Sequence, residues 1–311
     1  MRIFTLVLSI VLFHNISFAK WTIIDSTDVD PSGRLKYMNR FLYIDNTDNI
    51  WILANNADEL IKFNEQSTVF FDTSNTNLPF MQISCATQGP NGDMYFGTYE
   101  DYTSPNMASL IRYDGENWES FNQFNSPMYP YGIHDILETG EDEFWSANVI
   151  GLYHYKKGKW NSYFEDENLY RRDINKLAID KNNNLYIANN YRELYSADLN
   201  KANIKFNKVA TPYTQQAGAL PCNIDSLNNL WVNHSGKIYK KEGNNWKNYD
   251  TMGVPIVTRD KKLYAQLFGV VYEYKDNSKW EKIFSFPDTL SGLLLKAKTP
   301  KAIFGLHLAT H

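Results

Sequence analysis

Residues 142–163 read DEFWSANVIGLYHYKKGKWNSY, and this stretch shows how the whole chain is organised. It holds three short apolar and aromatic runs, at Phe144-Trp145, 152–155 and 160–163, separated by polar turns that contain Asn148 or Gly158. Short runs bounded by turn residues are typical of antiparallel strands joined by hairpins. No long window of the chain shows helical periodicity, so the sequence predicts a nearly all-β protein.

One part of that stretch, a hydrophobic residue followed by an aromatic one, recurs at intervals that average about 42 residues. The pairs are Ile50-Trp51, Met94-Tyr95, Phe144-Trp145, Leu185-Tyr186, Leu230-Trp231, Leu263-Tyr264 and Ile303-Phe304. Turns rich in Asn, Asp or Gly, which tolerate left-handed backbone geometry, precede four of them, at 45–49, 91–93, 180–184 and 225–229. A period of this length is that of a four-stranded propeller blade.

The fold class predicted from this repeat is an all-β propeller of about seven four-stranded blades, with six as the alternative count. A lone blade cannot bury both faces of its sheet, whereas radial packing lets each blade cover the next. Residues 21–24 match the fourth-strand pattern, so we expect them to close the ring by pairing with the last blade, drawn from 290–311. Because the sequence stops where the third strand of that blade should start, we expect an incomplete last blade or a truncated gene product.

The repeating unit resembles the two-component-regulator propeller repeat, and its copies include 142–145 with 151–155, and 111–118. The resemblance covers residues 21 to about 304. In that family, propellers form the sensor part of hybrid histidine kinases and also occur as stand-alone secreted proteins. The resemblance therefore implies a ligand-binding or protein-interaction module. This chain shows no kinase segment or coiled linker, and the family's Trp-x-Gly-Thr continuation survives only in part, at 95–98.

The first nineteen residues predict a secretory signal peptide. Met1-Arg2 gives a positive start, residues 3–13 are almost wholly apolar, and Ser17-Phe18-Ala19 offers small residues for cleavage near Ala19. The apolar run is too short to span a bilayer, and no later segment is long and apolar enough, so no membrane span is expected. We therefore expect a single propeller domain over 20–311 that is secreted or periplasmic.

Charge and motif content exclude several function classes. Lys plus Arg number 31 and Asp plus Glu number 35, without a basic run, so no nucleic-acid partner is expected. The sequence lacks a phosphate loop, a Gly-x-Ser-x-Gly, a His-Glu-x-x-His and a Cys-x-x-Cys motif, and its six histidines have no regular spacing. No catalytic residue, cofactor or metal is therefore predicted. Residues 28–33 match the first half of a calcium loop, but Asn39 stands where a bidentate Glu is needed.

Candidate ligand-binding residues come from the long loops on one face of the predicted ring. Second-to-third-strand loops and the links between blades share that face, and loops on rigid scaffolds commonly carry function. The predicted site residues are Tyr99, Asp101, Tyr102, Tyr129, Tyr131, His134, Asn148, Tyr191, Arg192 and His234. Rings stack on sugar faces and amides supply donors and acceptors, so the rim suits an oligosaccharide, a peptide or a partner protein. The alternative interpretation is turn chemistry with ordinary surface tyrosines.

Two further functions remain open from the sequence. The first is a lyase or hydrolase at the channel mouth, with His134, Asp101, His234 or Glu100 as acid and base groups. Asp135 is a poor partner for His134, because adjacent residues of a strand point to opposite faces. The second is a structural or assembly role without a small ligand, or a decayed copy of a sensor.

The two cysteines allow a sharper prediction. Cys85 lies ten residues before Tyr95, and Cys222 lies nine before Trp231, which places both on innermost strands, of blades two and five. Blades that far apart in the ring are nearly opposite, and a disulfide needs Cα atoms within about 7 Å. We therefore expect two free, buried thiols.

Overall fold

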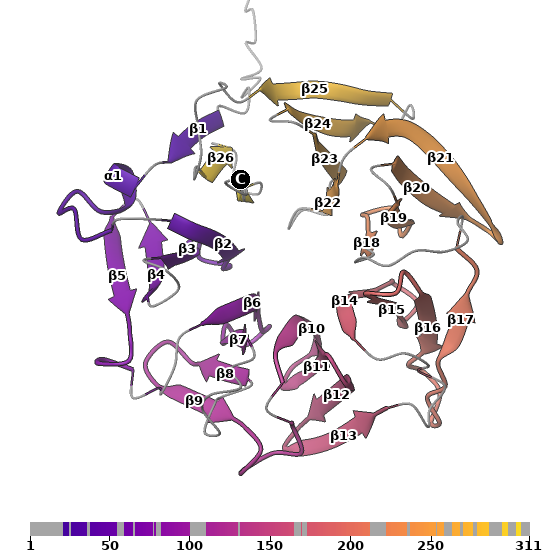
Figure 1. Ribbon diagram of the computed structural model, residues 1–311, viewed down its shortest axis with the longest axis horizontal. Coiled ribbons are helices and arrows are strands. Elements are labelled where there is room, and N and C mark those ends of the chain that lie inside the picture. Colours follow the sequence, from indigo (N-terminus) through magenta and orange to yellow (C-terminus); the bar gives the residue numbers. More distant parts are fainter. Residues whose placement is uncertain are drawn as a thin grey trace, which may run out of the picture.

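In the computed structural model the chain forms a ring of small antiparallel sheets set around a centre (Figure 1). The structure describes residues 21–24, 26–35, 38–54, 59–64, 66–76, 78, 82–99, 110–129, 131–164, 169, 173–211, 222–234, 237–252, 254–257, 263–267, 270–275, 279–285, 294–297 and 303–305. Six of the sheets have four strands each, and in each of them the strands follow one another in chain order. The all-β propeller predicted from the repeat is therefore confirmed.

The first three blades come from the first half of the chain. Blade 1 consists of β2 (Met38–Ile44), β3 (Ile50–Ala54), β4 (Glu59–Asn64) and β5 (Ser67–Phe71). Blade 2 consists of β6 (Ile83–Gln88), β7 (Met94–Thr98), β8 (Leu110–Tyr113) and β9 (Trp118–Phe121). Blade 3 consists of β10 (Ile133–Gly140), β11 (Glu143–Asn148), β12 (Gly151–Lys156) and β13 (Lys159–Tyr163).

The next three blades repeat the arrangement. Blade 4 consists of β14 (Ile174–Ile179), β15 (Asn184–Asn189), β16 (Leu194–Asp198) and β17 (Asn207–Val209). Blade 5 consists of β18 (Cys222–Ile224), β19 (Leu230–His234), β20 (Lys237–Glu242) and β21 (Asn245–Met252). Blade 6 consists of β22 (Val254–Val257), β23 (Leu263–Leu267), β24 (Val270–Lys275) and β25 (Lys279–Ser285).

A seventh sheet combines segments from both ends of the described chain. Its order is β1 (Trp21–Ile24), β26 (Leu294–Ala297), β27 (Ile303–Gly305), and β1 runs antiparallel to β26 with Trp21 opposite Ala297. The N-terminal strand β1 thus pairs with the C-terminal strand β26, while closure of the ring by a complete last blade stays a prediction. Only three strands of this sheet lie in the described residues, so the four-stranded blades number six, the alternative count. A short helix, α1 (Ser26–Val29), follows β1.

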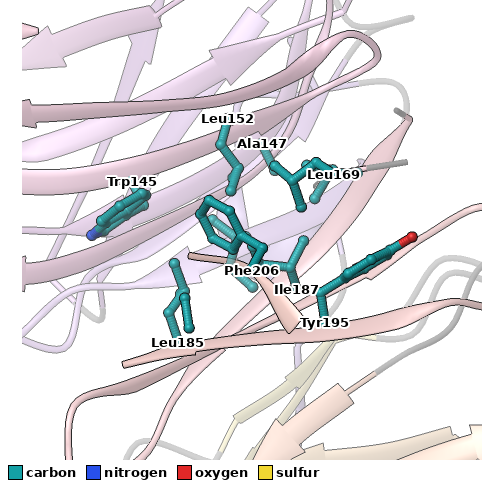
Figure 2. Close-up of a cluster of buried hydrophobic side chains, with 11 residues drawn as sticks. Trp145, Ala147, Leu152, Leu169, Leu185, Ile187, Tyr195 and Phe206 are labelled. Atoms are coloured by element: carbon teal, nitrogen blue, oxygen red, sulfur yellow. The ribbon is translucent and has the colours of Figure 1, made fainter. Parts of the chain in front are cut away.

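The recurrent aromatic residues pack between blades. The Trp51 ring of blade 1 lies 5.2 Å from Phe96 and 5.9 Å from Tyr113, both of blade 2, measured between ring centroids. Figure 2 shows the corresponding cluster between blades 3 and 4, where Trp145 and Leu152 meet Leu185 and Phe206, among others. Each blade therefore buries its apolar face against the next one, which is why the unit has to recur around a ring.

Chain direction gives the ring two different faces. The turns between the first and second strands and between the third and fourth strands lie on one side, named here the hairpin face. The second-to-third-strand connections and the links between blades lie on the other side, named here the loop face. The first strand of each blade is innermost, around the centre of the ring (Figure 1).

The innermost strands of blades 1 to 4 share a β-bulge near their first residue. Pairing with the second strand shifts at Met38/Arg40, Ile83/Cys85, Ile133/Asp135 and Ile174/Lys176. A bulge redirects the extra side chain out of the ladder. In blade 2 that side chain, Ser84, donates its hydroxyl hydrogen bond to the Ile133 carbonyl of blade 3. In blade 3 it is His134, whose ring reaches the Ile174 carbonyl of blade 4.

Both cysteines stand where the sequence placed them. Cys85 lies in β6 and Cys222 in β18, the innermost strands of blades 2 and 5, and both are free and buried. Burial raises the pKa of the Cys222 thiol to about 12. At neutral pH this thiol therefore stays protonated and unreactive.

Candidate functional site

Exposed aromatic side chains of the described residues gather on the loop face. Tyr99 follows the second strand of blade 2, and Tyr191 follows the second strand of blade 4. Phe124 and Tyr129 lie in the link from blade 2 to blade 3. The exposed fractions of Tyr99, Phe124, Tyr129 and Tyr191 are 44%, 70%, 52% and 45%. Elsewhere in the described chain only aliphatic large side chains reach comparable exposure, so the loop face carries the candidate contacts.

Tyr129 belongs to an aromatic platform that also includes Tyr131 and Phe164. The Tyr129 ring centroid lies 6.2 Å from that of Phe164 and 6.4 Å from that of Tyr131. Phe164 stands edge-on to the buried Tyr153 ring at 5.8 Å, and the Tyr129 backbone N–H donates to the Tyr153 hydroxyl at 3.1 Å. Gly151 makes room for Phe164, because a Cβ there would lie 2.5 Å from the ring. Contacts with the buried Tyr153 therefore hold the platform in place, while the Tyr129 ring is 52% exposed to solvent.

Phe124 lies in a turn of the link after blade 2, and the link after blade 1 contains a turn with the same hydrogen bonds. The Asn122 side-chain oxygen accepts from the Phe124 N–H at 2.9 Å, and the Asn125 side chain accepts from the Asn122 N–H at 2.9 Å. In the link after blade 1, Asp72 accepts from the Ser74 N–H at 2.8 Å within the same pattern. The position of Phe124 is therefore filled by Ser74 in the sister turn. The turn does not need a phenylalanine, which leaves the ring available for contact.

Tyr191 and Arg192 lie on a rigid turn between β15 and β16. The side-chain oxygen of Asn189 accepts from the Tyr191 N–H at 3.0 Å and from the Glu193 N–H at 2.9 Å. Arg192 has a φ of 60°, in the left-handed region. On the hairpin face, Asp45 accepts in the same way from the backbone N–H groups two and four residues later. The two turns therefore have the same hydrogen bonds, with the amide of Asn189 in place of the Asp45 carboxylate. The Tyr191 ring is consequently held on a fixed backbone.

His134 lies at the inner edge of the loop face, against blade 4. Its Nδ1 is 3.0 Å from the Ile174 carbonyl oxygen and 3.7 Å from Asp173 Oδ1. A carbonyl can only accept, so Nδ1 carries the proton and Nε2 of the neutral ring is an acceptor. Asp173 has a φ of 66°, and its backbone is fixed by hydrogen bonds to Val149 and Asn190. An unfavourable backbone conformation held from two sides is a feature that clusters at functional sites.

Asp135 pairs with Lys176 rather than with His134. Lys176 Nζ lies 3.0 Å from Oδ1 and 2.9 Å from Oδ2 of Asp135, and the Leu177 N–H donates to the same carboxylate at 2.8 Å. Burial lowers the pKa of Lys176, but the Asp135 carboxylate outweighs it and the net pKa is raised. The lysine is therefore charged and paired at neutral pH, and the carboxylate that faces His134 comes from Asp173 instead.

Two features of the sequence have local structural roles. Asn148 is fully buried, and its side-chain oxygen accepts from the Gly151 N–H at 3.0 Å, which favours turn chemistry over ligand contact at this position. Asp30, in the half-matched calcium loop, accepts from the Ser32 N–H at 3.0 Å and from the Leu35 N–H at 2.7 Å. Its carboxylate is committed to the link between β1 and blade 1.

The remaining predicted positions are only partly described. Glu100, Asp101 and Tyr102 lie outside the described residues. His234 ends β19, and its side chain is outside the description. Of the predicted residues, the structure brings Tyr129 and Tyr131 together, and it places Tyr99, Tyr191, Arg192 and His134 on the same face.

Three residues of the site escaped sequence reasoning. Phe124 was hidden in a link that otherwise reads as turn residues, although its comparison with Ser74 would have singled it out. Phe164 follows a fourth strand and resembles core in sequence. Asp173 reaches His134 from a distant part of the sequence and across a blade boundary, which no local pattern encodes.

No protein-family model matches the chain, and no curated protein sequence does either. Among solved structures, virginiamycin B lyase of Staphylococcus aureus matches with a TM-score of 0.66 and 12% identity, over 93% of this chain and 98% of that one. The extracellular domain of the hybrid two-component system BT4673 of B. thetaiotaomicron matches with a TM-score of 0.64 and 17% identity, over 92% of this chain and 40% of that one. YCF48 bound to D1 peptide matches with a TM-score of 0.63 and 11% identity, over 92% and 99%.

Similarity at these identities shows the fold alone. The structural neighbours include extracellular propeller domains of hybrid two-component systems, the group that the sequence repeat resembles. The neighbours' printed functions differ from one another, so the fold does not choose among them. Within the described part of the chain, the structure contains no helix of the length and apolar character needed to traverse a bilayer.

Proposed function

We propose that this chain is a ligand-binding propeller that holds its ligand on the loop face of blades 2 to 4. The observation that carries the proposal is the gathering of Tyr99, Phe124, Tyr129 and Tyr191 on that face. Aromatic anchors supply much of the free energy at binding interfaces, because they bury large apolar areas with few rotatable bonds. Tyr129 and Tyr191 stand on backbone already fixed by hydrogen bonds, which lowers the ordering cost of binding.

The ligand is recognised mainly by ring stacking and by neutral polar groups. On blades 2 to 4 the ammonium groups of Lys176 and Lys208 are paired within the protein, with Asp135 and Glu193 respectively. What remains for a ligand is the aromatic platform, the Nε2 acceptor of His134 and the turn at Tyr191. Such a set suits an oligosaccharide, a peptide or a segment of a partner protein.

We also propose that the protein works outside the cytoplasm, secreted or periplasmic. Residues 1–19 would direct export, and 20–311 would act as one propeller domain. The fold likeness to extracellular sensor domains supports this location. N-terminal sequencing of the exported protein is expected to find Lys20 first, and an uncleaved Met1 would contradict the proposal.

The test of binding is a glycan and peptide array probed with the exported chain, followed by thermal shift with each hit. A true ligand raises the melting temperature in proportion to the logarithm of its concentration above Kd. Tyr129→Ala and Tyr191→Ala are each expected to weaken binding about tenfold, the effect of truncating an interface anchor. Phe124→Ser, which installs the residue of the sister turn, tests the third anchor without disturbing the backbone.

A matched control lies on the opposite face. Leu227 is 66% exposed in a hairpin-face turn, so Leu227→Ala removes comparable apolar surface away from the proposed site. It is expected to leave binding unchanged. Equal loss in Leu227→Ala and Tyr129→Ala, or full binding by all three loop-face variants, would show that the loop face is not the binding face.

A second candidate function, a lyase or hydrolase, is favoured by one observation. The Ile174 carbonyl and Asp173 fix the His134 ring so that Nε2 is left as a base. If the bound ligand is turned over, His134→Gln is expected to abolish turnover, while binding weakens only by the loss of one contact, about tenfold in Kd. Recovery of the ligand unchanged after long incubation with the wild type would dismiss this candidate and leave the binding proposal intact.

A further inference from the structure

Glu138 occupies a position that four other blades fill with branched apolar residues. It lies opposite Phe144 in the ladder of β10 and β11. The residues in the same register are Ile44, Ile179, Ile224 and Val257 in blades 1, 4, 5 and 6, and Gln88 in blade 2. Gln88 points to the preceding blade, where its Nε2 donates to Asn46 Oδ1 at 3.2 Å. The Glu138 position likewise faces its preceding blade, so a carboxyl group lies in the interface between blades 2 and 3.

Blade 2 offers this carboxyl group the Tyr95 ring and the turn at Gly89, where the Asn91 amide also lies and donates to Asp93 at 2.8 Å. Glu138 Oε1 lies 3.2 Å from the point where a Cβ at residue 89 would stand, and Gly89 leaves that space open. The Tyr95 ring lines the same interface and packs on Phe144 at 5.0 Å between centroids. No hydrogen-bond donor or cation among the described residues contacts the Glu138 carboxyl group. The group is half-buried and its charge is uncompensated.

The other ionisable groups around Glu138 are engaged elsewhere or are anionic. From blade 2 they are the buried Tyr95 phenol and the Asp93 carboxylate, which is paired with Arg112. From blade 3 they are Asp142 in the adjoining turn, and Glu143, which pairs with His154 and Lys156. Asp135 and Lys176, on the same strand and the next blade, pair with each other. None of these neighbours supplies a positive charge to Glu138.

We propose that Glu138 makes the interface between blades 2 and 3 proton-sensitive: the interface closes on the neutral carboxyl group and loosens when the group ionises. The opposite end of this interface is packed tightly, since a Cβ at Gly97 would lie 2.8 Å from the Ile133 side chain of blade 3. Loosening therefore starts at the hairpin face, beside Gly89 and Tyr95. The inference stands independently of the ligand proposed above.

The direction of the effect follows from linkage. Burial raises the pKa of Glu138 from 4.5 to about 7. Between these two values the folded chain binds more protons than the unfolded chain, so stability falls as pH rises through this range. The contribution of the neutral carboxyl group is complete below about pH 4.5 and is lost above about pH 7.

Hydrogen exchange of the full exported chain at pH 5 and pH 8, corrected for intrinsic rates, tests the inference. In the wild type, amide protection in β7 and β10 is expected to fall about tenfold from pH 5 to pH 8. In Glu138→Gln, which keeps the shape and removes the titration, protection in the same strands is expected to change less than about twofold. Glu116→Gln, in an exposed hairpin of blade 2, is the matched control and should behave as wild type.

A second variant keeps the test decisive if the amide introduced by Glu138→Gln packs poorly in the interface. Glu138→Ile installs the residue of blades 1, 4 and 5, and its melting temperature is expected to exceed that of the wild type by a few degrees at pH 8, with the gap shrinking at pH 5. A wild-type pH dependence that persists in both Glu138 variants would overturn the inference. So would a loss of protection spread evenly over all blades.

Discussion

Blades 1 and 3 both bury a tryptophan in their second strand, but they treat its indole N–H differently. In blade 1, Asp45 Oδ2 accepts from Trp51 Nε1 at 3.0 Å and from Asn49 Nδ2 at 2.8 Å. Blade 5 repeats this with Asp225, whose Oδ2 lies 2.7 Å from the indole nitrogen of its own tryptophan. In blade 3, Trp145 Nε1 is buried and has no hydrogen-bond partner among the described residues.

Blade 3 holds its tryptophan by stacking instead. The His154 ring lies on the Trp145 ring with 4.1 Å between centroids and 8° between planes. His154 Nε2 is 2.9 Å from Glu143 Oε1, and Lys156 is 2.9 Å from Oε2 of the same carboxylate. Burial lowers the pKa of His154, and the Glu143 carboxylate offsets this only in part, so the ring is neutral at pH 7.

The two blades differ by a carboxylate that has moved one residue along the strand. Blade 1 reads Ile44-Asp45 where blade 3 reads Glu138-Thr139. Glu138 stands at the same register position as Ile44 and faces the preceding blade, so the carboxylate of blade 3 lies in that interface and not beside the indole. In these two blades the position of one carboxylate separates the hydrogen-bonded clamp of blade 1 from the interface of blade 3 that we propose to be proton-sensitive.

The largest effect is expected from Asp45→Asn. The change leaves the size of the side chain almost intact, but an amide N–H would face the donors Trp51 Nε1 and Asn49 Nδ2. The free energy of unfolding is expected to fall by about 3 kcal/mol at pH 7, because a buried charge-assisted network is broken. Urea unfolding followed by tryptophan fluorescence measures it.

The pH dependence of that variant gives a second readout. Burial raises the pKa of Asp45, but hydrogen bonds from Asn49, Thr47 and Trp51 outweigh it and the net pKa lies below 3.8. The wild-type advantage is therefore complete above pH 4 and is lost as pH falls below it. Asp114→Asn is the control, since that exposed carboxylate caps a hairpin in which an amide oxygen can accept the same N–H groups. Equal effects of both substitutions would contradict a special role for the indole bond.

Much of this fold could be predicted from the sequence, because the aromatic residue of most repeats is one that the blades bury. Trp51, Tyr95, Trp145 and Trp231, picked out by their spacing, all lie in second strands and are buried. The strand count of the last sheet could not be predicted, since it depends on pairing between residues 21–24 and 294–297, which are far apart in sequence. Local sequence patterns predict where a strand lies, whereas the number of strands in this sheet depends on pairing between distant segments.

The candidate site was harder to predict for a physical reason. Turn residues and contact residues are the same types, so Asn148 and Tyr191 look alike in sequence as members of a polar, aromatic loop. The structure separates them by burial, because Asn148 is enclosed and Tyr191 is exposed. His134 was placed correctly on a strand, but its partner Asp173 comes from the next blade, which spacing alone does not reveal.

The loop-face turn at Asn189 can be compared with the turn at Asp45, because an amide oxygen accepts the same backbone hydrogen bonds there. Asn189 Nδ2 donates to Glu193 Oε2 at 3.1 Å, a bond that the Asp45 turn does not need. Asn189→Asp would remove the donor and set two carboxylates side by side, with an expected loss of about 2 kcal/mol at pH 7. Because repulsion raises the pKa of one carboxyl group, stability is expected to recover as pH falls toward 4. Urea unfolding at pH 7 and pH 4 measures this, and a loss independent of pH would point to lost packing instead.

The smallest effect is expected from giving blade 3 the clamp of blade 1. Thr139→Asp with Glu143→Asn places an acceptor six residues and an amide two residues before Trp145, the spacing of Asp45 and Asn49 from Trp51. The new hydrogen bonds stabilise, but the exchange removes the pairs of Glu143 with His154 and Lys156, so a net gain of only about 1 kcal/mol is expected. Urea unfolding of the two single variants and the double variant completes the cycle.

Both single variants should lose stability, and the double variant should gain it. Thr139→Asp alone would set a second carboxylate beside Glu143, and like charges at close range repel. Glu143→Asn alone would break the pairs with His154 and Lys156 without supplying an acceptor for the indole N–H. Only the two changes together reproduce the donors and acceptors that surround Trp51, so their effects should be strongly non-additive. Additive effects would mean that the clamp does not form in blade 3.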